Sequence, residues 1–592
     1  MIRLAVSGLS VLTVLILILY WQGKAPFLID NDNIYLKTVA SGEMTGTPEP
    51  HMYYMEILSG TVLSLLYRLT GNGIPWFGIF LCLCFGVTMA LLLDRSLKAC
   101  RHPAWGVCIY LVYILVFGAF FYQYFAKTQY TIATGIIGAG ALFLLAVTEV
   151  HENTGIFLKR NIPFLILCAW SFGMREKGFL MLLPFLGMTF LAKVVFLKGE
   201  AAAGKKFRNT VFLGVLFVAL LGGLHLMSRL AYSDAEWQEF RAYTDASEIL
   251  FDYDGFPDYD SHEELYREVG ITRSSYEAIT RHYNILLDPA IGRESMEKLA
   301  QTAEAERLAS MPPVGEKLAE VAKIIFRRNF LDYVDRPLNV LVYLLYLFVF
   351  LLAVLKRRLR ALWKLSFIVI ARMFDWVYLI WFGRYPFRVT QIIYVAELVL
   401  LIALILKEEL WKVDNGKEKS GSLWKKFPAH PVFLLLLTGI VFVSFRFGFP
   451  KMKAYQREIQ GLRTMSVCFP ELEGYLEEHP ENFYYFDMSH LYYMEDTLPF
   501  KPAAFENYVY MGSWMPGSPW YNHKIRNAGI VDIADALITM PNVYLIYQQV
   551  DFDTRDFLDA YYADHFPGTK LVVKDVFTSS NGFVYEILKA EE

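Results

Sequence analysis

The stretch Leu4–Tyr20 reads LAVSGLSVLTVLILILY and follows a single basic residue, Arg3. A helix needs about 20 apolar residues to cross the hydrocarbon core of a bilayer, so this run is close to one span. Ten further apolar runs follow it: Ile74–Leu93, Trp105–Phe125, Thr131–Val147, Ile162–Phe172, Phe179–Phe196, Val211–Leu230, Leu338–Leu355, Leu365–Phe382, Val389–Leu406 and Val432–Phe445. The sequence therefore predicts a polytopic α-helical membrane protein with about eleven spans.

The connections between these runs alternate in charge. Every second connection is basic, and its residues are Arg95, Lys98, Arg101, Lys159, Arg160, Lys198, Lys205, Lys206, Arg208, Lys356, Arg357, Arg358, Arg360, Lys364, Lys407, Lys412, Lys425 and Lys426. Because cytoplasmic loops are enriched in Lys and Arg, we expect a multi-pass cell-membrane protein with a cytoplasmic N-terminus and an extracytoplasmic C-terminal domain. Counting Met52–Leu69 as a span would invert this pattern, so we expect that segment to lie on or dip into the outer surface.

Composition agrees with a membrane protein and excludes some partners. The chain has 592 residues, of which 55% are hydrophobic and 16% aromatic. A net charge of −3 gives no electrostatic footprint for nucleic acid. The six cysteines show neither a disulfide framework nor zinc-ligand spacing.

Two large polar regions interrupt the spans. Residues 1–450 form the expected membrane domain, which contains a first outer loop at 21–73 and a helical outer insertion at 231–337. In that insertion, Ser233 with Glu236 and Ser274 with Glu277 match the capping-box pattern of helix starts. Residues 451–592 form a separate extracytoplasmic α/β domain, with strands expected at Asn482–Met488, Val543–Gln549, Lys570–Val576 and Gly582–Leu588 and a helix at Asp551–His565.

Two carboxylates, Asp30 and Asp32, follow the first apolar run almost directly. They would lie at the membrane surface, where lipid-bound substrates present their head groups. One of them could act as a base while the other orients it, or the pair could hold a divalent cation. The composition is equally typical of acids that cap a short interfacial helix. No further metal ligands accompany them, so no cofactor is predicted, and a divalent cation stays an open alternative.

Basic residues at the outer ends of the spans could meet an anionic head group. Arg384 and Arg388 stand out, because positive residues in an outer turn run against the orientation bias. A guanidinium group can hold phosphate oxygens through two parallel hydrogen bonds, although Arg and Lys at span ends also reach for lipid head groups. The candidate substrate-binding residues are Arg175, Lys177, Arg384, Arg388, His51, Lys127 and Arg336.

Several short motifs resemble those of a known family. The first outer loop, with Asp32-x-x-Tyr35, Ser41-Gly42, Thr45-Gly46-Thr47-Pro48 and His51, resembles that of the GT-C membrane glycosyltransferases, most of all a bacterial branch that uses lipid-linked sugar donors. Matching segments elsewhere are Leu65–Tyr67, Pro75–Phe77, Asp252–Asp254, Gly270-Ile271 and Gly383–Val389.

The resemblance implies a GT-C-like bundle and a definite chemistry. It implies an inverting transferase that takes a sugar from a polyprenyl-phosphate-linked donor and places it on a cell-surface glycan or lipid acceptor, outside the cytoplasm. The family's catalytic acid lies in the first outer loop, and Asp32 matches it best, with Asp30 as the second candidate. This chain lacks a clean pair of adjacent acids there, so the choice between the two stays open.

Other readings of the sequence lead to different functions. A transporter or flippase of lipid-linked saccharides would favour polar sites at mid-membrane in two related halves, and no such symmetry is visible. A polysaccharide polymerase and a non-catalytic assembly protein also stay open. The charged residues Arg372, Asp375 and Glu397 fall within spans, and we expect them to form a structural ion pair or triad rather than a transport path.

Overall fold

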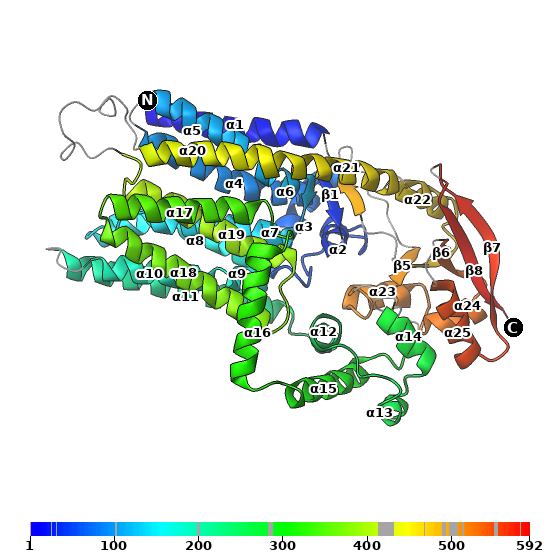
Figure 1. Cartoon of the computed structure of the whole chain (residues 1–592). Helices are drawn as coiled ribbons and strands as arrows, with labels where there is room; N and C mark the ends of the chain where they lie inside the picture. Colours follow the sequence, from blue (N-terminus) through cyan, green and yellow to red (C-terminus); the bar gives the residue numbers. More distant parts are fainter. Residues whose placement is uncertain are drawn as a thin grey trace, which may run out of the picture.

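The protein divides into a long helical bundle and a polar region at one end of it (Figure 1). The computed structural model describes residues 2–24, 27–30, 32–100, 103–197, 202–281, 288–412, 431–466, 468–487, 493–496, 507–511, 514–549, 554–580 and 582–591. In Figure 1 the N-terminus lies at the far end of the bundle, and the insertion and the C-terminal domain both lie beyond the other end.

Each of the eleven apolar runs forms a helix of the bundle. These helices are α1 (Ile2–Lys24), α4 (Trp76–Ala99), α5 (Pro103–Val116) with η2 (Phe117–Phe121) and α6 (Tyr122–Ala126), α7 (Tyr130–Val147), α8 (Thr154–Met174), α10 (Leu183–Val195), α11 (Ala203–Ala231), α17 (Leu338–Leu355), α18 (Leu359–Trp381), α19 (Phe387–Lys407) and α20 (Pro431–Val443). Within the described residues, nine helices are long and apolar enough to cross a membrane. The other two runs form α10, which is shorter, and α18, which carries Arg372 and Asp375.

The segment Met52–Leu69, which the charge pattern excludes as a span, contains α3 (Ile57–Thr70), an apolar helix of only 14 residues. It packs against α8 and α11 near the polar end. Gly60 of α3 lies against the backbone of Pro50, where any Cβ would overlap the carbonyl oxygen. This close approach explains why a glycine stands in the middle of the helix.

The centre of the bundle is built from α7 and α19, which are buried along most of their length. Small residues let the neighbouring helices approach closely. A Cβ on Gly135 would come within 2.5 Å of Ile392, and one on Gly140 within 2.5 Å of the Thr88 hydroxyl. Close approach of this kind is the main source of helix association in lipid, where burial of apolar surface contributes little.

Three distant segments meet in a small sheet at the polar end. Strand β1 (Phe27–Asp30) runs parallel to β2 (Lys127–Thr128) and antiparallel to β4 (Tyr493–Asp496). The first outer loop, the turn before α7 and the C-terminal domain therefore lie at the same end of the bundle. Helix α2 (Asp32–Ser41) follows β1 and is almost wholly buried.

The C-terminal region is an α/β domain, as the sequence predicts. Its sheet has the order β5-β3-β6-β8-β7, in which the first three strands are parallel and β8 and β7 are antiparallel. The strands are β3 (Phe483–Asp487), β5 (Tyr508–Met511), β6 (Val543–Gln548), β7 (Lys570–Thr578) and β8 (Val584–Glu591), and the helices are α22 (Cys468–Glu478), α23 (Pro519–Asn527), α24 (Ile533–Thr539) and α25 (Thr554–His565). The expected boundary between the membrane domain and the C-terminal domain, at residue 450, falls within a continuous helical stretch. In it, α20 continues through η6 (Ser444–Gly448) into α21 (Phe449–Ser466).

The insertion is helical and has a hydrophobic core of its own, which includes Leu250, Tyr266 and Leu299. Its elements are α12 (Ala235–Glu248), η3 (Ile249–Asp254), α13 (Glu263–Glu268), α14 (Arg273–Arg281), α15 (Arg293–Ala309), α16 (Val314–Phe326) and η4 (Arg327–Leu331).

The two capping boxes expected in the insertion are not formed. The Ser233 hydroxyl donates to the carbonyl of Leu230, which belongs to the preceding helix. Before α14 it is Thr272, not Ser274, that accepts a hydrogen bond from the amide of Ser275. Helices α12 and α14 do begin beside the two motifs. At α14 the neighbouring Thr272 accepts the amide hydrogen bond, and before α12 the Ser233 hydroxyl bonds back to the preceding helix.

The charged residues within the spans form a buried ion pair. Arg372 of α18 donates to Glu397 of α19, with 2.6 Å between Nη1 and Oε1, and to the Tyr343 hydroxyl at 2.7 Å. Tyr346 donates to the same carboxylate at 2.7 Å. Asp375 stays outside the pair, and its Oδ2 has no hydrogen-bond partner among the described residues. The expected structural pair is therefore present, but it is not a triad with Asp375.

This pair predicts a specific pattern of stability. Glu397→Leu leaves the guanidinium of Arg372 buried without its counter-charge, which typically costs about 3–5 kcal/mol. We expect a markedly lower unfolding temperature for this variant in detergent. The double variant Arg372→Met with Glu397→Leu should recover most of the loss, because no charge is left unpaired. Equal unfolding temperatures for wild type and Glu397→Leu would contradict a structural role for the pair.

The topology predicts which end of the bundle is accessible from outside. Gly46 lies in the first loop, Gly204 begins α11 at the opposite end, and both positions are exposed. In a cysteine-free background, a cysteine at 46 should react with an impermeant thiol reagent added to intact cells. A cysteine at 204 should react only after the membrane is opened. The reverse result would invert the assignment of sides.

Candidate active site beside the first span

Asp32 is placed by its neighbour Asn33, whose side chain is fully buried. The Asn33 amide nitrogen donates to the carbonyl of Thr128 at 3.1 Å, and its oxygen accepts from the backbone amide of Tyr130 at 3.1 Å. These two bonds fasten the start of α2 to the start of α7. Asp32 is half-buried and stands in the first turn of α2, where the helix dipole favours a carboxylate.

The ring of Tyr130 joins Asp32 to two arginines. The Tyr130 hydroxyl lies 3.5 Å from Asp32 Oδ2, which is long for a hydrogen bond. The Arg175 guanidinium lies 4.8 Å from the ring centre, in a cation–π contact, and donates to the Thr131 hydroxyl. The charge of Arg388 also acts on the Tyr130 phenol. Residues of the first loop and of α7, α8 and α19 thus converge at one point.

Arg388 is a cation without a partner in the part of the chain that the structure describes. It is half-buried in the first turn of α19, and no hydrogen bond or ion pair joins it to any of the described residues. A positive charge at a helix N-terminus is opposed by the helix dipole, so this position brings no stability of its own. Its charge acts on the carboxyl group of Asp252 without a direct contact, so an anionic ligand at this end of the bundle could still form hydrogen bonds to the guanidinium.

Aromatic side chains from the first loop and the C-terminal domain pack together beside Asp32. The ring centre of Trp514 lies 4.7 Å from that of Tyr54 and 5.7 Å from that of Tyr35. Burial, followed by the charge of Asp32, raises the pKa of the Tyr54 phenol well above its usual value. Tyr54 is therefore neutral at physiological pH. Because Trp514 packs on protein rings, its segment closes over the first loop in this structure.

Two of the predicted binding residues already have acidic partners in the insertion. Glu248 of α12 accepts from Lys177 and from Arg384, the latter at 3.3 Å. Arg384 also pairs with Asp252 at 2.6 Å and lies over the ring of Tyr253. These contacts fasten the insertion to two outer turns of the bundle. Lys177 and Arg384 therefore lie beside the cluster around Tyr130, but their charges are balanced by carboxylates.

The other predicted residues occupy different positions at this end. His51 contacts Glu49 through Nδ1 and the carbonyl of Ala231 through Nε2 at 3.2 Å, and it stacks on Trp237, so it joins the first loop to the insertion. Arg336 lies 4.0 Å above the ring of Tyr333. The backbones of Asp30 and Lys127 lie in β1 and β2, but their side chains fall outside the described part of the structure.

Sequence reasoning missed the residues that hold the cluster together. Tyr130 directly precedes an apolar run, where a tyrosine is usually an interfacial anchor. Asn33 directly follows Asp32, and nothing in the sequence indicated its buried contacts. In the part of the chain that the structure describes, no three His, Cys, Asp or Glu side chains gather as metal ligands. The divalent cation considered for Asp30 and Asp32 stays a prediction, because only Asp32 has a described side chain.

Comparisons with known proteins give one structural likeness. No family model matches the chain, and no curated protein matches it in sequence. Among solved structures, the chain is similar to ArnT from Cupriavidus metallidurans, whose structure was determined bound to undecaprenyl phosphate. The two share 10% sequence identity, the match covers 98% of this chain and 97% of ArnT, and the TM-score is 0.38.

The contact between Glu49 and His51 predicts a pH-dependent contribution to stability. Burial raises the pKa of Glu49, but the hydrogen bonds and charge of His51 outweigh it, and the net pKa lies below the usual 4.5. A depressed pKa in the folded state adds stability above pH 4.5 that is lost as the pH falls through the lowered value. The unfolding temperature of Glu49→Gln should therefore lie below that of wild type at neutral pH, and the gap should close in acid. A gap that persists at low pH would show that the charge is not its source.

Proposed function

We propose that the protein is a GT-C-type membrane glycosyltransferase. It transfers a sugar from a polyprenyl-phosphate-linked donor to a cell-surface glycan or lipid acceptor, at the end of the bundle that carries the polar domains. One observation carries this proposal: a half-buried acid just beyond the first span shares its surroundings with Arg175 and with Arg388, which has no partner among the described residues.

Asp32 would act as the base. A hydroxyl of the acceptor attacks the anomeric carbon of the donor sugar, and its proton passes to the Asp32 carboxylate. The bond between that carbon and the phosphate oxygen breaks, and its electron pair leaves with the polyprenyl phosphate. Attack from the side opposite to the leaving group inverts the configuration at the anomeric carbon, which agrees with the family resemblance.

The leaving phosphate gains charge as this bond breaks. Arg388 and Arg175 are the cations that could receive it, because both lie around Tyr130 and neither has a carboxylate partner among the described residues. A fixed positive charge that meets developing negative charge is usually among the largest contributions to catalysis. Lys177 and Arg384 would act indirectly, by holding the insertion against the bundle through Glu248.

Removal of the proposed base tests the function. Membrane vesicles that contain the protein would receive lipid-linked sugars extracted from the same cells, and mass spectrometry would follow their conversion to free polyprenyl phosphate. Asp32→Asn should lower this rate by about 10²–10⁴-fold, the usual contribution of a general base. Asp258→Asn is the matched control. The carboxylate of this exposed acid of the insertion accepts hydrogen bonds from Ser261 alone among the described residues, so the variant should leave the rate unchanged.

The same preparation separates a transferase from a flippase. A transferase releases free carrier and glycosylated acceptor together, whereas a flippase moves intact lipid-linked sugar across the bilayer. If the purified protein moves the donor between leaflets and releases no carrier phosphate, the transferase proposal is wrong. Full activity in Asp32→Asn would remove Asp32 from the mechanism and leave Asp30 as the acid to test.

A further inference from the structure

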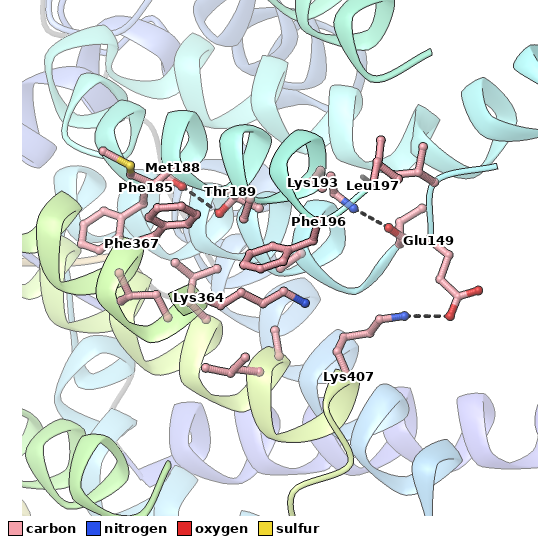
Figure 2. A pocket seen from close by; sticks show the side chains of 18 of the residues that line it. Glu149, Phe185, Met188, Thr189, Lys193, Phe196, Leu197, Lys364, Phe367 and Lys407 are labelled. Carbon is pink, nitrogen blue, oxygen red and sulfur yellow. Dashed lines mark hydrogen bonds and ion pairs between the residues drawn. The ribbon is translucent and has the colours of Figure 1, made fainter. Parts of the chain in front are cut away.

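A cavity lies at the opposite end of the bundle from Asp32. Its volume is about 400 Å³, and it is lined by α10, α18, the final turns of α7 and α19 and the connection after α7 (Figure 2). Tyr130 and Arg388 begin α7 and α19, whereas Ala146 and Lys407 line the cavity at the other ends of the same helices. No residue of the cluster around Tyr130 contributes to it.

One part of the cavity is apolar. Phe185 and Met188 of α10, with Phe196 directly after that helix, face Phe367 of α18, and the rings of Phe196 and Phe367 lie 6.4 Å apart. Ala192 is a small residue at the lining of the same helix, which leaves room between α10 and α18. These walls offer an acyl chain the same surroundings as the lipid phase.

The rim of the cavity is basic. Lys407 pairs with Glu149 at 2.8 Å, and Lys364 pairs with Glu408 at 2.5 Å. Lys193 donates to the carbonyl of Thr148 at 2.5 Å and is bonded to no carboxylate among the described residues. Figure 2 shows Lys193, Lys364 and Lys407 around the opening. At this opening the three ammonium groups of Lys193, Lys364 and Lys407 meet two carboxylates, those of Glu149 and Glu408.

This combination selects one class of ligand. A free anion would gain nothing from the aromatic wall, and a neutral lipid would leave the excess positive charge unanswered. Basic pockets between spans are typical sites for anionic lipid head groups. We propose that this cavity binds an anionic phospholipid, with its phosphate among Lys193, Lys364 and Lys407 and the start of an acyl chain against Phe185, Met188 and Phe367. Such a lipid would join α10 to α18 and α19, and this role is independent of the proposed function.

Binding can be tested on the purified full-length protein in detergent. Dioleoylphosphatidylglycerol, dioleoylphosphatidylcholine and inorganic phosphate would be titrated separately, with the unfolding temperature and native mass spectrometry as readouts. We expect phosphatidylglycerol alone to raise the unfolding temperature and to stay bound. An equal effect of phosphatidylcholine would show ordinary lipid solvation, and an equal effect of inorganic phosphate would show a free-anion site. Either result would overturn the proposal.

Two kinds of variant separate charge from shape. Lys193→Gln with Lys407→Gln removes two ammonium groups, while the amide introduced at position 193 can still donate to the carbonyl of Thr148. This double variant should weaken phosphatidylglycerol binding by about tenfold or more. Ala192→Phe fills the apolar part with every lysine in place and should also weaken binding.

Lys159→Gln is the matched control for these variants. Lys159 is exposed at the same end of the bundle, near the start of α8, but it does not line the cavity. It should bind phosphatidylglycerol as wild type does. Wild-type binding by both the double-lysine variant and Ala192→Phe, or an equal loss in Lys159→Gln, would overturn the assignment to this cavity. Unfolding temperatures measured without lipid show whether each variant is folded.

Discussion

The candidate site depends on the buried side chain of Asn33. Its amide donates to Thr128 and accepts from Tyr130, so the first outer loop is tied to the start of the most buried helix of the bundle. Strand β1 adds backbone hydrogen bonds to the same turn and to the C-terminal domain. Because buried polar groups cost free energy when they lack a partner, these contacts form together or not at all. The position of the Asp32 carboxylate is thereby set by the packed bundle rather than by the loop alone.

The helices of the membrane domain could be predicted from sequence because a run of about 20 apolar residues marks a bilayer crossing, whether it faces lipid or, as in α7 and α19, other helices. All eleven apolar runs appear as helices, including α18 despite Arg372 and Asp375, whose cost is partly met by Glu397 of the next span. The convergence of Asp32, Tyr130, Arg175 and Arg388 could not be predicted in the same way. It depends on which helices are neighbours, and hydropathy carries no such information. The pairing of β1 with β4, which joins the two ends of the chain, is hidden for the same reason.

Local rules also failed where a neighbour competed for the same hydrogen bond. Ser274 has the spacing of a capping residue, but the hydroxyl of Thr272 accepts the amide of Ser275 and takes that role. Likewise Glu176 has two basic neighbours in the sequence, Arg175 and Lys177, but its Oε2 lies 2.9 Å from Nδ1 of His225 in α11. In both cases the sequence indicates that a polar contact forms in this region, and the tertiary structure decides which atom is the partner.

The pairing of charges distinguishes the two ends of the bundle. At the polar end, the acids of the insertion neutralise Lys177 and Arg384, and Arg388 forms no direct ion pair in the described chain. At the other end, lysines outnumber the acids around an apolar cavity. An excess of positive charge beside apolar surface is costly in a membrane unless an anion accompanies it. Each end therefore suits an anionic lipid, and our two proposals assign the polyprenyl-phosphate donor to the polar end and a bound phospholipid to the other.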